Sequence, residues 1–312
     1  MPLSISYDIS YGKLAIPVYR VYATPLSGVA AIPESAFSGR PNILFALEVD
    51  VEVFGDNFLP AYTRGDNSQV VATDSMKNFV LRETLAYQGA TIEGLLAELG
   101  HKFLATYPQM HGLRLSGREL PFPAAQVPQA GGFGASDLLF RRSHDDYTTA
   151  QIDFVREGEQ SRIAALRSGR VGMQLLKVTG SAFTSFVRDG YTTLPERRDR
   201  PLFIYADVSW SYTDPADAVA SDHSRYIAAE QVADLMQVVF HEFVSESIQH
   251  LLHEIGIRLL ERFPQMASVS FEAQNRTRDP MAESSTDPRI KVYSDPFSAY
   301  GLLRLTLTRG AS

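Results

Sequence analysis

Apolar residues follow two different periods along this chain, and together they predict a sheet with helices packed on it. Alternation typical of strands runs through residues 14–23, 42–54, 113–120, 171–180, 202–212, 268–274 and 301–309. Helical spacing takes over at residues 91–107, and at residues 228–263, a stretch long enough for two helices. Each half of the chain therefore runs strands, helices, strands, which favours an α+β fold with an antiparallel sheet and helices on one face.

Local signals refine this pattern. Thr91 is a candidate N-cap for the first helix, and Pro108 is a candidate stop. Residues 118–137 are rich in Pro and Gly and are expected to form a loop, as are residues 282–288. The apolar run 70–72 is expected to close a strand, with the polar pair Thr73 and Asp74 at its end.

A short sequence recurs at half the chain length. Residues 104–110 are "LATYPQM" and residues 260–266 are "LERFPQM", so the two prolines, Pro108 and Pro264, stand 156 positions apart in a chain of 312. Each copy ends an amphipathic segment and precedes a strand-like one. The spacing predicts a tandem duplication, with one domain at residues 1–150 and a second at residues 151–312.

Composition narrows the class of protein. The formal net charge of -7 argues against nucleic acid and anionic membranes as partners. The absence of cysteine removes disulfides, thiolate metal sites and thiol nucleophiles. With no basic, apolar leader at the N-terminus and no apolar run of about 20 residues, we expect a soluble, cytoplasmic protein.

Common catalytic patterns are weakly represented. The chain has no Gly-rich phosphate loop and no GxSxG, which leaves nucleotide binding and Ser-His-Asp hydrolysis unsupported. His250, His253 and Glu254 share one helical face, with Glu246 one turn earlier, and could ligate zinc. Such residues more often form a solvated helix face, so we expect no metal.

Six segments, in order, resemble the urate oxidase (uricase) family. They are "YGK" at 11–13, "GDNSQVVATDSMKN" at 65–78, "LLKVTGSAFTSFVRDGYTTLPERRDR" at 175–200, "SESIQ" at 245–249, "EAQNRTR" at 272–278 and "PFSAYGLLRLTLTRG" at 296–310. The resemblance implies two tandem T-fold domains, antiparallel sheets with helices packed on one face, that assemble into a tunnel-shaped barrel oligomer. It also implies oxidation of urate by O2 without a metal or organic cofactor.

The same resemblance implies a role for particular residues. Lys13 and Thr73 would form a proton relay, because a lysine next to a hydroxyl can act as a base. Asn275, with Thr73, would hold O2 or water above the ring. Substrate contacts would come from the Arg200 fork, the Gln249 amide, the Phe183 ring, and the backbone amides of Asp74 and Ile248. Lys and Thr would belong to one subunit and Arg, Gln and Phe to its neighbour, in a homotetramer.

Each of these residues also has a plainer interpretation. Arg200 could form a surface ion pair with Asp199, Phe183 could be a core aromatic, and Gln249 could cap a helix. Joint occurrence in family order favours catalysis. The alternatives left open are another fused nitrogen heterocycle as substrate and a protein that binds purines without turnover.

One position departs from the family pattern. Thr277 stands where these proteins usually carry a histidine that completes the relay with lysine and threonine. A threonine does not titrate near neutrality, so it cannot be a general acid or base there. Arg276 and His250 are candidates to replace the missing group.

This departure generates a direct test. If Thr277 tunes the activity, a Thr277→His variant should oxidise urate about 100-fold faster or more, since a positioned acid-base group contributes at least that much. Loss of urate absorbance in air measures the rate. An unchanged rate would show that the relay works without a titrating group at this position.

Overall fold

The computed structural model describes residues 4–276, 278–294 and 298–310, and the chain divides into two compact units. The first unit comprises the chain up to Ala30, Ser38–Ser168 and Asp214–Tyr226. The second comprises Ala31–Phe37, Gly169–Thr213 and the chain from Ile227 onward. No helix in the described part of the chain is long and apolar enough to cross a membrane.

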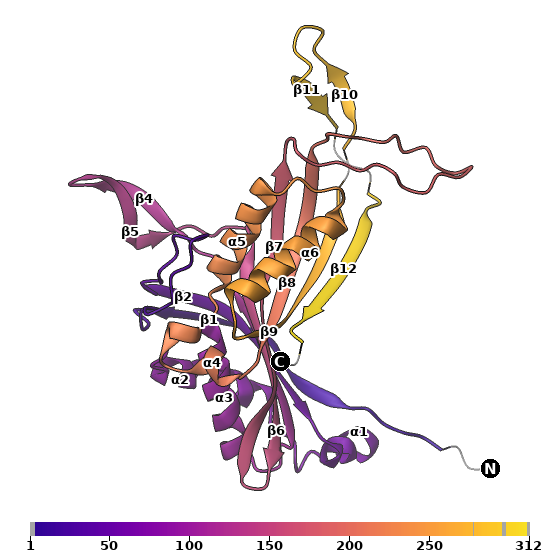
Figure 1. The fold of residues 1–312 in the computed structure, drawn as a ribbon. Helices are drawn as coiled ribbons and strands as arrows, with labels where there is room; N and C mark the ends of the chain where they lie inside the picture. The colour runs from indigo at the N-terminus through magenta and orange to yellow at the C-terminus, as the bar shows by residue number, and fades with distance from the viewer. Residues whose placement is uncertain (1–3, 277, 295–297, 311–312) are drawn as a thin grey trace. The chain divides into compact units, whose positions relative to one another are not determined.

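The first unit contains a sheet, four helices and two short helical turns (Figure 1). Its elements are β1 (Ser10–Val21), β2 (Leu44–Phe54), η1 (Asp56–Phe58), α1 (Leu59–Arg64), α2 (Thr73–Ala86), α3 (Ile92–Thr106), β3 (Gly112–Glu119), β4 (Ala124–Gln129), β5 (Gly132–Phe140), β6 (Tyr147–Glu157), α4 (Ala216–Val219) and η2 (His223–Arg225). Strand order in the main sheet is β1-β2-β3-β6-β7, and the pairs β1-β2, β2-β3 and β3-β6 are antiparallel. Strands β4 and β5 form a separate two-stranded sheet.

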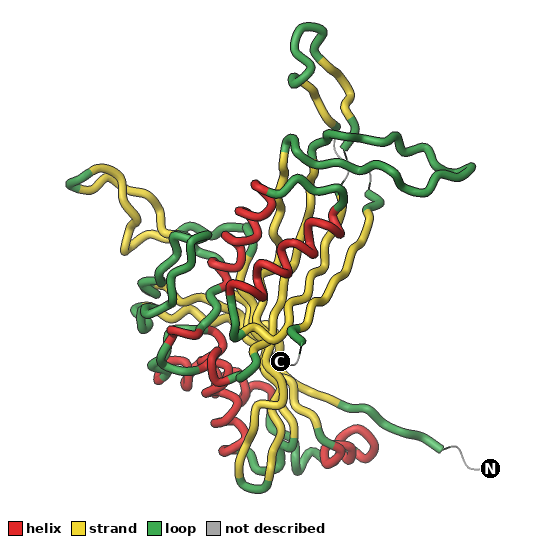
Figure 2. Tube along the Cα trace, in the orientation of Figure 1, coloured by secondary structure: helices red, strands yellow, loops and turns green. Residues whose placement is uncertain are grey.

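Strand β7 (Gln160–Lys177) contributes its first half to one unit and its second half to the other. The second unit adds β8 (Leu202–Tyr212), α5 (Ala229–Glu242), α6 (Ile248–Arg262), β9 (Met266–Asn275), β10 (Pro280–Glu283), β11 (Lys291–Tyr293) and β12 (Gly301–Thr308). Its sheet order is β7-β8-β9-β12, and α5 and α6 lie side by side over this sheet (Figure 2).

Burial follows the predicted periods. In β8 every second residue is buried, and Trp210 at its centre is almost fully covered. A strand with one buried face must alternate in this way, because successive side chains point to opposite faces of the sheet. The α+β prediction, the strand runs and the division of residues 228–263 into two helices are confirmed.

Two local predictions were wrong. Residues 118–137 are no loop, because β4 and β5 form an antiparallel hairpin whose two-residue turn uses the Gly-rich stretch. Val70 and Val71 do not close a strand either. Thr73 and Asp74 begin helix α2, which buries only Met76, Val80 and Thr84 and so leaves a weak helical pattern.

The internal repeat extends well beyond the seven residues that reveal it. Thr91 and Ser247 are the N-caps of α3 and α6, and each accepts a hydrogen bond from the third amide of its helix. They are 156 positions apart (247 minus 91), the same offset as Pro108 and Pro264. Helices α2 and α5, each of 14 residues, begin at positions 73 and 229, again 156 apart.

Each repeat closes with the same arginine clamp. Arg156 on β6 donates through Nε to the Met110 carbonyl at 2.9 Å and through Nη2 to the carbonyls of Leu104 and Tyr107. Arg309 after β12 repeats all three bonds with Met266, Leu260 and Phe263, each 156 positions further on. The carbonyls at a helix C-terminus have no partner within the helix, so the guanidinium satisfies them and complements the helix dipole.

Removing either clamp should lower the stability of its own unit. We expect Arg156→Gln and Arg309→Gln each to lower the free energy of unfolding by about 2 kcal/mol, because partly buried carbonyls lose charged donors. Urea unfolding measures the change. Arg162→Gln is the matched control, since Arg162 pairs with Glu157 at the exposed surface and should cost less than about 1 kcal/mol. Equal losses in all three variants would contradict the role of the clamps.

Candidate active site in two halves

The predicted relay residues come together in the first unit. Lys13 lies on β1, and α2 packs along this strand with Thr73 and Asp74 at its start. The pKa of the Asp74 carboxyl lies below its usual value, chiefly through the hydrogen bond from Lys77, with a further contribution from the Lys13 charge. The strand residue and the helix start, 61 positions apart in sequence, are therefore electrostatic neighbours.

Helix α2 presents unsatisfied groups at this end. Ala72 is the N-cap and offers no side-chain bond, so the first-turn amides, including that of Asp74, have no partner within the helix. The Thr73 hydroxyl is half-buried and makes no hydrogen bond with any described residue. A helix N-terminus with free amides carries partial positive charge and suits an anionic or electron-rich ligand.

Strand β1 is irregular directly after Lys13. The pairing of β1 with β2 shifts between Lys13 and Ile16, and Ala15 adopts a left-handed conformation with φ of 53°. The Ala15 amide donates to the Asp50 carboxylate at 2.6 Å, which holds the bulge in place. Tyr11, two residues before Lys13, accepts a hydrogen bond from the Val71 amide at 3.2 Å. Burial raises the pKa of this tyrosine.

The predicted substrate residues come together in the second unit, through backbone hydrogen bonds that join three segments. Phe183 and Arg197 exchange two bonds, of 2.8 and 3.0 Å, and the Arg200 amide donates to the Ser181 carbonyl at 2.9 Å. The Ala182 amide donates to the Ser245 carbonyl at 2.8 Å. The segments that carry Phe183, Arg200 and the start of α6 are thus adjacent.

Side-chain contacts in this half fit a binding role better than the plainer interpretations. The Arg200 guanidinium lies over the Phe183 ring, with 5.2 Å between Cζ and the ring centroid. Its buried Nε has no hydrogen-bond partner among the described residues, and burial lowers the pKa of the group. The suggested ion pair with Asp199 is wrong, because that carboxylate instead accepts from Thr179 and Gly180, both at 2.7 Å.

Phe183 is not a core aromatic, and Gln249 does not cap a helix. Phe183 is only half-buried and stacks on Phe186, with centroids 4.9 Å apart. Gln249 is exposed at the second position of α6, where Ser247 acts as the N-cap instead. Ile248 opens the helix, so its amide belongs to the first turn and lacks an intrahelical partner.

Asn275 ends β9, where it pairs with Ile204 on one side and Gly301 on the other. Thr277 lies outside the described residues. Of its suggested replacements, Arg276 is held between Tyr205 and Tyr300, at 4.9 and 4.2 Å from their ring centroids. His250 packs edge-on against Phe243, with 4.7 Å between the ring centroids.

Hollows in the two units differ in size and in chemistry. A small one of about 40 Å³ opens beside Arg200. Arg197, Arg278 and Lys291 also line it, together with the carboxylates of Asp199 and Asp279, so cations outnumber anions there. A larger one of about 760 Å³ in the first unit is lined by Tyr87, His101 and His223, among others, and by none of the predicted site residues. The smaller hollow therefore fits the predicted substrate chemistry better than the larger one.

The proposed zinc cluster does not form as an isolated ligand set. Glu254 accepts a hydrogen bond from Arg258 at 2.8 Å, and the described residues contain no group of three or more His, Asp or Glu that could hold a metal ion.

Comparison with known proteins places this arrangement in a family. A model of the uricase family matches residues 55–165 and again residues 166–302. The chain is 48% identical to a uricase of Halalkalicoccus jeotgali over 301 residues, which cover 96% of this chain and 98% of that protein. A uricase of Haloferax volcanii is also 48% identical, over 97% of this chain and 98% of its own length.

Solved structures similar to this chain belong to the same family. A urate oxidase from Bacillus sp. TB-90 is 44% identical and superposes with a TM-score of 0.94, over 97% of this chain and 100% of that one. A uricase from Bacillus fastidious is 40% identical with a TM-score of 0.93, over 97% of this chain and 94% of that one. The chain belongs to the uricase family and consists of two tandem T-fold domains.

The repeat explains why the two halves differ. The position equivalent to Gln249 in the first unit is Glu93, by the same offset of 156 (249 minus 93). Glu93 is buried, and it accepts hydrogen bonds from Ser168 at 2.6 Å and Tyr226 at 3.1 Å. In the second unit, Ala229 stands at the position of Thr73. Each unit therefore carries only one half of the predicted chemistry.

Glu93 gives a pH dependence whose sign is defined. Burial raises the pKa of its carboxyl, so the folded protein keeps the proton where the unfolded chain, with a pKa of about 4.3, has released it. Stability contributed by this group is present below the unfolded pKa and falls as pH rises towards the folded pKa. A Glu93→Gln variant should lose that slope in melting temperature above about pH 4.3, whereas Glu98→Gln should retain it. Identical slopes in Glu93→Gln and the parent protein would contradict this assignment.

Proposed function

We propose that this chain is a urate oxidase that uses O2 to oxidise urate without a metal or organic cofactor. The convergence of Phe183, Arg200 and the start of α6 carries the proposal, because it assembles a flat, cationic binding surface. The names of the relatives that share 48% identity over nearly the whole chain support the same substrate. The proposed location is the cytoplasm.

Recognition follows from the chemistry of the second unit. Urate is a flat anion with neighbouring oxygen and nitrogen acceptors, and the Arg200 fork donates to such a pair in its own plane. Phe183 stacks on the ring, and Gln249 supplies one donor and one acceptor. The Ile248 amide adds a donor from a helix N-terminus, where partial positive charge favours an anion.

Proton transfer falls mainly to Lys13 and Thr73 of the first unit, while Asn275 and position 277 belong to the second. Lys13 and Thr73 form the relay that removes a proton from the bound ring, and deprotonation makes the heterocycle a better electron donor to O2. The Asp74 amide contacts the polar edge of the ring from the start of α2. Asn275 and Thr73 hold O2 or water above the ring, and Thr277 takes the place of the usual histidine.

Because the two halves belong to different units, we propose that each site joins the first unit of one subunit to the second unit of a neighbour, in a homotetramer. The clean division of Lys13 and Thr73 from Arg200 and Gln249 supports this arrangement.

Single variants should separate the two roles. Lys13→Met should lower kcat by about 100- to 10,000-fold, since a general base is lost. Arg200→Gln should lower kcat/KM by about 30-fold or more, mainly through KM, because a charged, partly buried contact is removed. The measurements are loss of urate absorbance and uptake of O2. Oxygen uptake with another fused nitrogen heterocycle, and none with urate, would refute the proposed substrate.

Mixing the two variants tests the shared site. When Lys13→Met and Arg200→Gln subunits are co-expressed in equal amounts, roughly a quarter of the sites should receive both intact halves and regain activity. A double variant that carries both changes in one chain is the matched control, because it can form no intact site. An activity of the mixture no higher than the sum of the single variants would contradict sites shared between subunits.

A further inference from the structure

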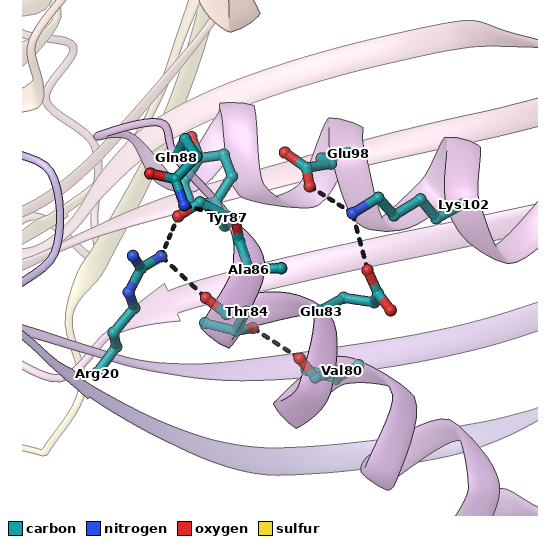
Figure 3. A network of polar contacts seen from close by, with 9 residues as sticks. All are labelled: Arg20, Val80, Glu83, Thr84, Ala86, Tyr87, Gln88, Glu98 and Lys102. Atoms are coloured by element: carbon teal, nitrogen blue, oxygen red, sulfur yellow. Dashed lines mark hydrogen bonds and ion pairs between the residues drawn. The ribbon is translucent and has the colours of Figure 1, made fainter.

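Arg20, on the same strand as Lys13, holds the far end of helix α2. Its Nη1 donates to the Thr84 carbonyl at 2.9 Å and also to the Tyr87 carbonyl, as Figure 3 shows. Tyr87 is the C-cap of α2, so both acceptors belong to the end of the helix where carbonyls lack intrahelical donors. The cation also complements the negative end of the helix dipole.

Strand β1 therefore contacts α2 at both of the helix's ends. From Lys13 to Arg20 the strand spans about 23 Å, at 3.3 Å per residue, and the 14 residues of α2 span about 21 Å. Tyr11 holds the segment before the helix through the Val71 amide, and Arg20 holds the helix end. With β1 fixed to β2, the position of α2 along β1 sets where Thr73 and Asp74 stand relative to Lys13, whose charge acts on the Asp74 carboxylate.

Other contacts of α2 restrain this position less directly. Lys102 on α3 bonds Glu83 on α2 at 2.8 Å and Glu98 on its own helix at 2.7 Å (Figure 3). Lys102 is 40% exposed, and an ion pair of that kind restrains a helix weakly. The Arg20 contact differs because a part-buried guanidinium bonds main-chain atoms, whose positions are those of the helix itself.

The second unit provides a natural comparison. Lys177 on β7 donates to the Phe243 carbonyl at 3.0 Å, and Phe243 is the C-cap of α5, 156 positions after Tyr87. A similar backbone bond recurs, since Gly172 has a φ of 87° and its amide donates to the Asp207 carboxylate at 2.7 Å. An ammonium group thus performs the same anchoring in the repeat whose helix begins with Ala229. The acceptor Phe243 lies two residues before Ser245, and the segment of Ser245 is joined to those of Phe183 and Arg200.

We propose that Arg20 is a positioning residue for the Lys13–Thr73 relay, acting through the axial placement of α2; the assignment rests on the proposed function. Among the described residues, the Arg20 side chain bonds only main-chain carbonyls at the end of α2. Its effect should therefore fall on the groups at the start of that helix, the Thr73 hydroxyl and the Asp74 amide, and spare Phe183, Arg200 and Gln249 in the other unit.

The test is Arg20→Gln beside Arg20→Lys. Because a misplacement of about 1 Å can cost on the order of 100-fold in rate, we expect Arg20→Gln to lower kcat by about 10- to 100-fold. KM should change by much less than kcat, because only the Asp74 amide among the proposed substrate contacts moves with α2. Arg20→Lys should restore most of kcat, as the lysine of the second unit implies. Hydrogen exchange at residues 73–76 should quicken in Arg20→Gln and return towards the parent value in Arg20→Lys.

Lys177→Gln is the matched control, because it removes the same kind of anchor from the other repeat. Its neighbourhood belongs to the substrate half, so KM should rise while kcat falls less than in Arg20→Gln. An unchanged kcat in Arg20→Gln would overturn the proposal. So would equal losses of kcat in Arg20→Gln and Lys177→Gln, or a loss that Arg20→Lys fails to rescue in protein of parental melting temperature.

These outcomes are distinct from failure of the proposed function. If the parent protein oxidises no urate, the function is wrong, and hydrogen exchange alone decides whether Arg20 places the start of α2. Unchanged exchange at residues 73–76 in Arg20→Gln would then reject the anchor.

Discussion

The C-terminal end of every long helix in the described chain meets a cation from a strand or from the residue directly after one. Arg20 bonds the end of α2, Arg156 that of α3, Lys177 that of α5 and Arg309 that of α6. Helix ends packed on a sheet expose carbonyls to an interior where water cannot satisfy them, and a strand arginine or lysine supplies the donors. Each of these bonds joins the main chain at a helix end to a side chain from the sheet, so the four cations fix the helix ends against the strands.

That constraint links the scaffold to the chemistry, since the two site halves sit at helix starts. Thr73 and Asp74 begin α2, and Ile248 and Gln249 begin α6. Duplication gave both units the same frame, and single positions then diverged. Ala229 occupies the place of Thr73, and Glu93 occupies the place of Gln249 and is bonded into the core. The second unit therefore lacks the hydroxyl of the proposed relay, and the first lacks the amide of the proposed substrate contact.

Much of this frame could be predicted from local pattern, because it depends on period and on capping residues. Thr91, the alternation of β8 and the offset between Pro108 and Pro264 all give signals within a few residues. Helix α2 gave no such signal, since it buries only three residues and follows two valines. The hairpin of β4 and β5 resembles a loop because its residues are half-exposed and rich in Pro and Gly.

The candidate site was predictable only through family resemblance. Lys13 and Asp74 are brought together by packing of α2 on β1, and no spacing rule connects positions so far apart. Arg20 was missed altogether, although it lies within a strand that the pattern predicts. An arginine on a strand carries no local mark that it bonds a helix end 64 and 67 positions away. Alignment of the two repeats is the signal that could have found it, because Lys177 stands 157 positions after Arg20, the offset that also separates Gly172 from Ala15 and Asp207 from Asp50.

Ala15 on β1 and Gly172 on β7 both have a positive φ, and each donates its amide to an aspartate. Gly172 adopts its φ of 87° freely, whereas Ala15 adopts 53° at a cost of roughly 1 kcal/mol for an L-residue. Glycine would leave the backbone free to sample many other conformations, and alanine narrows that choice. Strand β1 next to Lys13 is thus stiffer than β7 next to Gly172. The backbone that carries the lysine is held more rigidly, at some expense in folding energy.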